Sequence, residues 1–108
     1  MAKPVKPRNH ASVRKQYPDY IRALDGLGKA VGEAGPLSEK VRHLVQLGAA
    51  AAIRSEGAVH SHARQALDAG ASADEVRHAV ISVTSTIGFP NVMASLSWIG
   101  DVIRRGRR

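Results

Sequence analysis

Apolar residues recur at spacings of three and four along most of the chain, and this pattern predicts helices. The first helix is expected to begin near Pro18, a residue suited to a first helical turn, and to end before Gly35 and Pro36. Its apolar positions are Tyr20, Ile21, Leu24, Leu27, Ala30 and Val31.

A second helix is expected to begin after Ser38, which is a good N-cap, with Glu39 in its first turn. From Val41 to Ile53 the sequence is almost wholly apolar. A helix that is apolar on nearly all sides is typical of burial on all sides, so we expect this to be the central helix of the fold.

Three more helices are expected in the rest of the chain. One runs from about 58 to 69, and a capping box formed by Ser72 and Glu75 opens the next, which continues to Ile87. The sequence Gly-Phe-Pro at 88–90 breaks that helix and starts the last one. Residues 80–86 are rich in β-branched side chains but have no partner strand. The predicted fold is therefore all-α, a compact bundle of about five to six helices.

A chain of 108 residues is expected to form one domain with a limited core. Residues 1–13 contain two prolines and no periodicity, so we expect a basic flexible arm there, a single helical domain over 14–104, and a basic tail at 105–108.

The net charge of +7 comes from the two ends of the chain. Residues 17–103 hold seven basic and nine acidic residues, and no basic helix face interleaved with aromatic side chains occurs there. We therefore do not expect specific nucleic-acid binding. The absence of cysteine excludes disulfides, thiolate metal sites and thiol redox chemistry. No apolar run reaches membrane-spanning length and no signal peptide is evident, so we expect a cytoplasmic protein that does not bind membranes.

Five short motifs follow one another between 37 and 103. They are Leu37-Ser38, Arg42 before a Leu-Val-rich helix, His62-xxx-Ala66-xxx-Gly70, Ser72-Ala-Asp-Glu-Val76 and Ile87-Gly-Phe-Pro90. Their order resembles the carboxymuconolactone decarboxylase family, whose superfamily includes the alkyl hydroperoxidase D type. The resemblance implies an all-helical protein that assembles with copies of itself as a homotrimer or homohexamer, which suits a core of small residues.

The chain departs from the hydroperoxidase branch at its reactive positions. That branch carries a Cys-xx-Cys-xxx-His motif whose histidine falls on His62, while the two cysteines fall on Ser55 and Ala58. Its glutamate in the preceding helix falls on His43. Thiol-dependent peroxide reduction is therefore excluded. The decarboxylase branch also lacks the thiol pair, although Thr86 stands where that branch often has tyrosine.

His62 lies near one helical face with Ala66 and Gly70, so its ring is either a hydrogen-bonded core histidine or part of a site. The resemblance favours a catalytic role. His43 directly precedes the apolar run, where burial disfavours the charged imidazole. The pairing of His43 with His62 follows from the resemblance and not from their spacing.

Two further residues complete the candidate site. Glu56 is the acid nearest to His62 in the sequence, so it either orients that imidazole or complements the helix dipole. Arg42, beside His43, is the cation best placed to bind a substrate carboxylate. His60 is expected on an outer stripe, in solvent or at a subunit boundary.

We do not expect a metal or another cofactor. The alternative ligand set is His43, His60 and His62, but His60 and His62 stand about 200° apart around a regular helix and cannot face one ion. The predicted function is cofactor-free acid/base chemistry, either decarboxylation or proton transfer, on a small carboxylated substrate. The alternative is a non-catalytic oligomeric scaffold, or a protein that binds a small ligand or metal, which retains the same fold.

Overall fold

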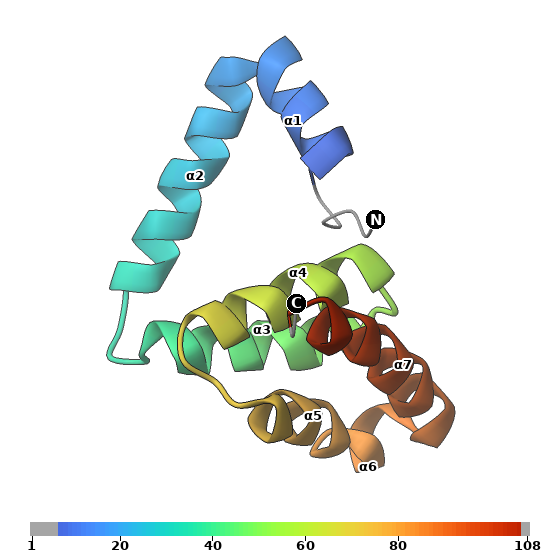
Figure 1. The fold of residues 1–108 in the computed structure, drawn as a ribbon. Coiled ribbons are helices and arrows are strands. Elements are labelled where there is room, and N and C mark those ends of the chain that lie inside the picture. The colour runs from blue at the N-terminus through green and yellow to red at the C-terminus, as the bar shows by residue number, and fades with distance from the viewer. Residues whose placement is uncertain (1–6, 107–108) are drawn as a thin grey trace. The chain divides into compact units, whose positions relative to one another are not determined.

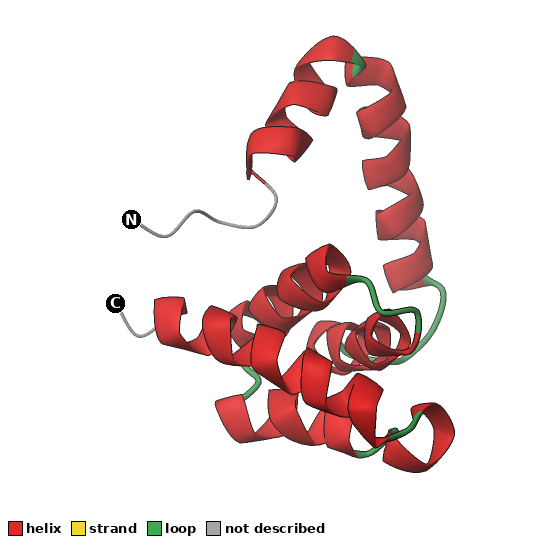
Figure 2. Cartoon of the chain, turned by 90° about the vertical axis from the view of Figure 1, so that its right-hand side faces the viewer, coloured by secondary structure: helices red, strands yellow, loops and turns green. Residues whose placement is uncertain are grey.

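The computed structural model describes residues 7–106, and this part of the chain consists of helices and connecting loops without a strand (Figures 1 and 2). The predicted all-α fold class is confirmed. The helices are α1 (Pro7–Gln16), α2 (Pro18–Glu33), α3 (Glu39–Ala52), α4 (Glu56–Asp68), α5 (Ala73–Ile81), α6 (Thr84–Ile87) and α7 (Phe89–Gly106). No helix within 7–106 has both the length and the apolar character that crossing a membrane requires.

The chain divides into two compact units, Met1–Ser38 and Glu39–Arg108. The first contains α1 and α2, which are linked by an ion pair of 3.1 Å between Arg14 and Asp25. Residues 7–13, expected to be an irregular arm, belong to α1, whereas the other expected arm residues and residues 107–108 of the tail lie outside the described part. A single domain over 14–104 stays a prediction.

The second unit is built around the pair α3 and α4, which α7 contacts along α4 and α5 contacts along α3 (Figure 1). Its core is made mainly of small and medium aliphatic side chains, as the low aromatic content requires. Fully buried residues from all four helices meet there, including Leu47, Ala51, Val59, Ala63, Ala66, Val76, Val80, Val92 and Ile99.

The expectation that α3 is buried on all sides is wrong for the single chain. Only Leu47, Ala50 and Ala51 are buried, whereas Val45 is 59% exposed. The reason is that α4 and α5 cover two faces of α3, and much of the remaining apolar surface lines an open groove.

The helix expected from Ser72 to Ile87 is interrupted, because α5 ends at Ile81 and the short α6 begins at Thr84. The hydroxyl of Ser82 donates to the Ala79 carbonyl, and that of Thr84 donates to the Ile81 carbonyl. Such local bonds compete with the helical backbone pattern and explain why the interruption falls here.

Other predicted boundaries are confirmed. The Ser72 side chain accepts a bond of 3.0 Å from the Glu75 amide, while the Ser72 amide donates to the Glu75 carboxylate at 2.9 Å. Gly88 adopts a φ of +90°, which L side chains rarely tolerate, and this residue separates α6 from α7. These two turns fix where α5 and α7 begin.

Candidate functional site

The site lies on the helical hairpin formed by α3 and α4. Residues 53–55 connect the two helices, and the Ser55 hydroxyl caps α4 by accepting a bond of 3.3 Å from the Ala58 amide. Ser55 and Ala58 are the positions where the hydroperoxidase branch would carry its cysteines, so a helix cap occupies the place of the thiol pair. Because the connection is short, α3 and α4 pack side by side and bring together residues that are far apart in the sequence.

His43 of α3 and His62 of α4 are in direct contact across this hairpin. Their Nδ1 atoms are 3.3 Å apart, and the ring centroids are separated by 5.6 Å with the planes tilted by 33°. The centroid separation is close to the nitrogen–nitrogen distance plus the radius of each ring, so the two nitrogens point at one another. One Nδ1 therefore carries a proton and donates a hydrogen bond to the other Nδ1, which accepts it through its lone pair.

Both rings favour the neutral form. Burial lowers the pKa of His43 from its ordinary value of 6.5, the Glu39 carboxylate opposes this shift, and the Arg42 guanidinium adds to it. Burial also lowers the pKa of His62, and its neighbour His43 lowers it further. At neutral pH the pair therefore consists of two uncharged imidazoles that share one hydrogen bond.

Arg42 lies beside His43, as its electrostatic effect on that ring shows. Its Nε atom is buried and makes no hydrogen bond to any described residue. A buried donor on a charged group is costly to leave unpaired, and guanidinium groups bind carboxylates with favourable geometry. Arg42 thus places a positive charge near His43, and its Nε has no acceptor among the described residues.

Glu56 lies in the first turn of α4 and is exposed. Its charge raises the pKa of His60, one turn later, and has no comparable influence on His62. The structure therefore places Glu56 next to His60 and does not bring it to the pair formed by His43 and His62.

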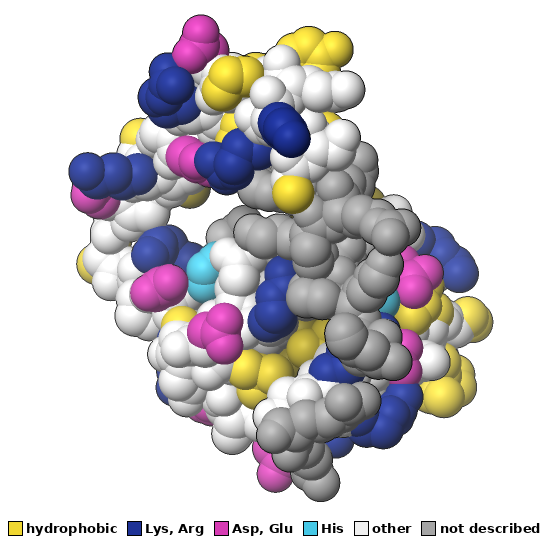
Figure 3. Space-filling view, turned by 45° about the horizontal axis from the view of Figure 1, so that its top comes forward, with side chains coloured by type: hydrophobic (Ala, Val, Ile, Leu, Met, Phe, Trp, Pro, Cys, Tyr) yellow, Lys and Arg dark blue, Asp and Glu magenta, His cyan; other side chains and the backbone are white. Residues whose placement is uncertain are grey.

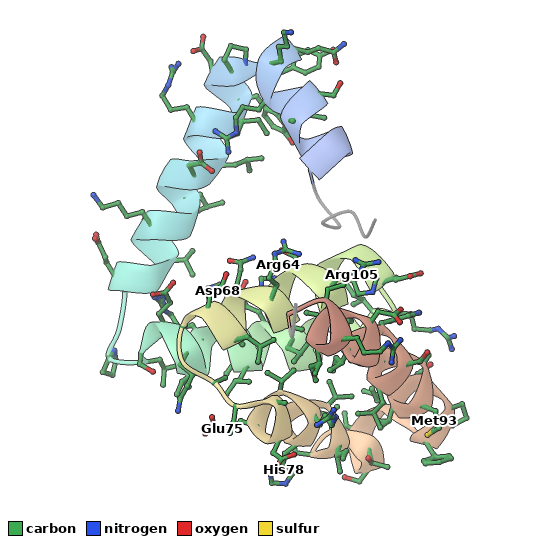
Figure 4. The ribbon with its side chains drawn as sticks, in the orientation of Figure 1. Arg64, Asp68, Glu75, His78, Met93 and Arg105 are labelled. Atoms are coloured by element: carbon green, nitrogen blue, oxygen red, sulfur yellow. The ribbon has the colours of Figure 1, made fainter. Side chains whose placement is uncertain are left out.

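The expected solvent exposure of His60 is wrong, because its side chain is only 7% exposed. Helix α7 packs on this face of α4 and brings Asp101 and Arg105 close enough to affect the ring; Figure 4 labels Arg105 on α7 and Arg64 on α4. Burial lowers the pKa of His60, and its Nε2 makes no hydrogen bond within the described residues.

The three histidines considered as metal ligands do not converge. His62 meets His43 across the hairpin, whereas His60 lies with α7 residues. Among residues whose side chains are described, no group of three histidines or carboxylates is arranged to hold a metal ion.

Glu39 belongs to the site, although its place in the sequence indicated only a role in the first turn of a helix. Its carboxylate oxygen lies 3.9 Å from Nε2 of His43, one turn further along α3. The signal that identifies it is the spacing of four residues between an acid and a histidine on one helix, which places both side chains on one face.

A separate groove of about 670 Å³ lies on another face of α3. Its lining is mostly apolar and comes from α3, α5 and the segment that follows, and neither His43 nor His62 contributes to it. Glu75 and His78, labelled in Figure 4, are its charged or titratable lining residues among those described. The groove therefore carries little acid/base chemistry.

Basic and acidic side chains are interspersed on the face drawn in Figure 3. In the described part of the chain, local ion pairs include Arg22 with Asp19 and Arg77 with Asp74. This face therefore offers no broad surface of one charge in the described part of the chain.

Comparison with known proteins gives the family. Residues 18–101 match the carboxymuconolactone decarboxylase family. An uncharacterized protein of Haemophilus influenzae is 37% identical over 59 residues, so the match covers 55% of this chain and spans about half (52%) of that relative. An uncharacterized protein of Methanocaldococcus jannaschii is 28% identical over 90 residues, covering 83% of this chain and 84% of that protein. No solved structure matches the chain. Because the family match extends over most of the sequence, the chain belongs to the carboxymuconolactone decarboxylase family.

Proposed function

We propose that the protein catalyses acid/base chemistry, either decarboxylation or proton transfer, on a small carboxylated substrate without a cofactor. The observation that carries this proposal is the contact of 3.3 Å between the Nδ1 atoms of His43 and His62. Two half-buried neutral imidazoles in direct contact form a proton acceptor and donor suited to work near neutral pH.

Arg42 supplies substrate binding in this proposal. Its guanidinium acts electrostatically on His43, and a carboxylate bound to it would lie close to the histidine pair. Glu56, which the sequence analysis included among the catalytic residues, has no part in the proposal because its charge acts on His60.

The proposal includes self-association as a homotrimer or homohexamer. It is supported by large apolar side chains that the single chain leaves exposed in the second unit, such as Ile53 at 75% and Phe89 at 63%. Burial of apolar surface of this kind is a main driving force of oligomer formation.

A substrate panel with histidine variants tests the chemistry. Small carboxylic acids and carboxylated lactones are incubated with the protein, and release of carbon dioxide and exchange of substrate protons with deuterated water are measured. We expect His62→Ala and His43→Ala to abolish turnover or exchange. His78→Ala is the matched control, because His78 is exposed and lines the separate groove.

The outcome also separates the enzyme from the non-catalytic scaffold. A scaffold predicts no turnover or exchange on the panel, and loss of a partner for the remaining histidine would then appear only as a stability cost of about 1–3 kcal/mol. Full activity of the folded His62→Ala variant would contradict the catalytic assignment.

A further inference from the structure

Three ionisable groups follow one another through the histidine pair. Glu39 lies 3.9 Å from Nε2 of His43, and the Nδ1 of the same ring lies 3.3 Å from Nδ1 of His62. The ring of His43 therefore presents one nitrogen to a carboxylate and the other to a second imidazole. His62 contacts His43 through Nδ1, and its Nε2 makes no hydrogen bond to any described residue.

We infer that Glu39 is a positioning residue that keeps the proton of neutral His43 on Nε2, which makes Nδ1 of His62 the hydrogen-bond donor and leaves Nε2 of His62 as the basic nitrogen. The catalytic consequence of this arrangement rests on the proposed function, since Nε2 of His62 would be the atom that exchanges a proton with the substrate. The assignment of tautomers is a separate claim that needs no substrate.

The assignment follows from the charge on each side of His43. A carboxylate accepts hydrogen bonds and cannot donate them, so a lone pair on Nε2 facing Glu39 would be repelled, whereas an N–H dipole there is attracted. With the proton on Nε2, Nδ1 of His43 holds the lone pair. The contact of 3.3 Å then requires that Nδ1 of His62 carries the proton. The partner of one ring nitrogen commonly fixes the imidazole tautomer, and here the carboxylate at 3.9 Å acts through its charge.

No other carboxylate competes with Glu39 for this role. Burial lowers the pKa of His43, and the charge of Arg42 lowers it further. Among the described residues, Glu39 is the carboxylate that raises it. The pKa of His62 is lowered by burial and by His43. The negative charge that selects between the two tautomers therefore acts on one end of the pair, through His43.

The same arrangement accounts for the path of a proton taken up by the pair. When Nε2 of His62 accepts a proton from the substrate, its Nδ1 proton passes to Nδ1 of His43. His62 is then neutral with its proton on Nε2, and His43 is an imidazolium with protons on both nitrogens. One proton has entered, none has left, and the positive charge now lies beside the Glu39 carboxylate.

Nitrogen NMR of the imidazole rings tests the inference. Chemical shifts of ¹⁵N-labelled histidine distinguish a protonated ring nitrogen from one with a lone pair, and they are measured at pH 8 on the full chain. We expect protonated Nε2 in His43 and protonated Nδ1 in His62. In Glu39→Leu both rings should shift toward a mixture of tautomers. Glu39→Gln loses the charge and has a side-chain amide that can accept or donate, so both rings should again shift toward a mixture of tautomers, and the pKa of His43 should fall.

Glu56→Leu and Glu56→Gln are the matched controls, because Glu39 and Glu56 are both acids in the first turn of a helix. They carry the same loss of helix-dipole stabilisation, but should alter His60 and leave His43 and His62 unchanged. Protonated Nδ1 on His43 in the wild type, or unchanged tautomers in Glu39→Leu, would overturn the inference. Either result leaves the acid/base proposal to be decided by turnover of the His62→Ala variant, so the two claims fail separately.

Discussion

At the scale of single residues, three buried or half-buried histidines link folding to pH. The pKa values of His43, His60 and His62 are all below the ordinary value of 6.5, and burial is the largest cause for each. As the pH falls below 6.5, these histidines become protonated in the unfolded chain while they are still neutral in the folded chain. We therefore predict that the free energy of unfolding is greatest above pH 6.5 and falls as the pH decreases from 6.5 through the lowered pKa values.

Urea denaturation between pH 8 and pH 5 measures this effect. Each histidine contributes about 1.4 kcal/mol for every unit by which its folded pKa lies below the unfolded value. His60→Phe keeps an aromatic ring at the buried position without a titrating group, and should make the stability less dependent on pH. Equal stability at pH 8 and pH 5 in the wild type would contradict the prediction.

The candidate site was only partly predictable from single residues. His43 and His62 are 19 positions apart, and no helical period relates them, so the resemblance to a family was needed to pair them. The burial of His60 depends on α7, which begins almost thirty residues later in the chain. Local sequence could not reveal this contact. The role of Glu39 was accessible, since an acid four residues before a histidine shares its helix face.

At the scale of elements, the start of α5 depends on reciprocal bonds between Ser72 and Glu75. Ser72→Ala removes the acceptor for the Glu75 amide, and we predict a loss of about 0.5–2 kcal/mol in the free energy of unfolding. Chemical denaturation measures the loss. Ser97→Ala, at an exposed position inside α7, is the control and should change stability little. Equal effects of the two substitutions would show that the cap contributes nothing.

Sequence predicted helix starts better than helix interiors. The capping residues and the Gly-Phe-Pro break act locally, so their signals are complete within a few positions. The break between α5 and α6 was missed because the hydroxyls of Ser82 and Thr84 bond to backbone carbonyls that a periodicity pattern does not register. The exposure of Val45 was missed because an apolar pattern indicates that a surface needs covering without showing which chain covers it.

At the scale of the whole molecule, the exposed apolar residues of the second unit bear on assembly. We predict that light scattering at micromolar concentration gives three or six times the 11.5 kDa mass of one chain. Dilution should dissociate the assembly if apolar contacts between copies hold it together. A monomer throughout the concentration range would contradict the prediction, and α3 would then keep its apolar surface in water.

The division of the chain at Ser38 separates its natural chromophores. Trp98, the single tryptophan, packs partly buried against the core of the unit Glu39–Arg108, whereas both tyrosines, Tyr17 and Tyr20, belong to Met1–Ser38. Tryptophan fluorescence, excited beyond the tyrosine absorption band, therefore follows the unit that holds the histidine pair and not the other. Both tyrosines are 59% exposed, so unfolding of Met1–Ser38 changes their surroundings little. Comparison of tryptophan fluorescence with helical circular dichroism on one unlabelled sample thus reports whether the two units melt together or in sequence.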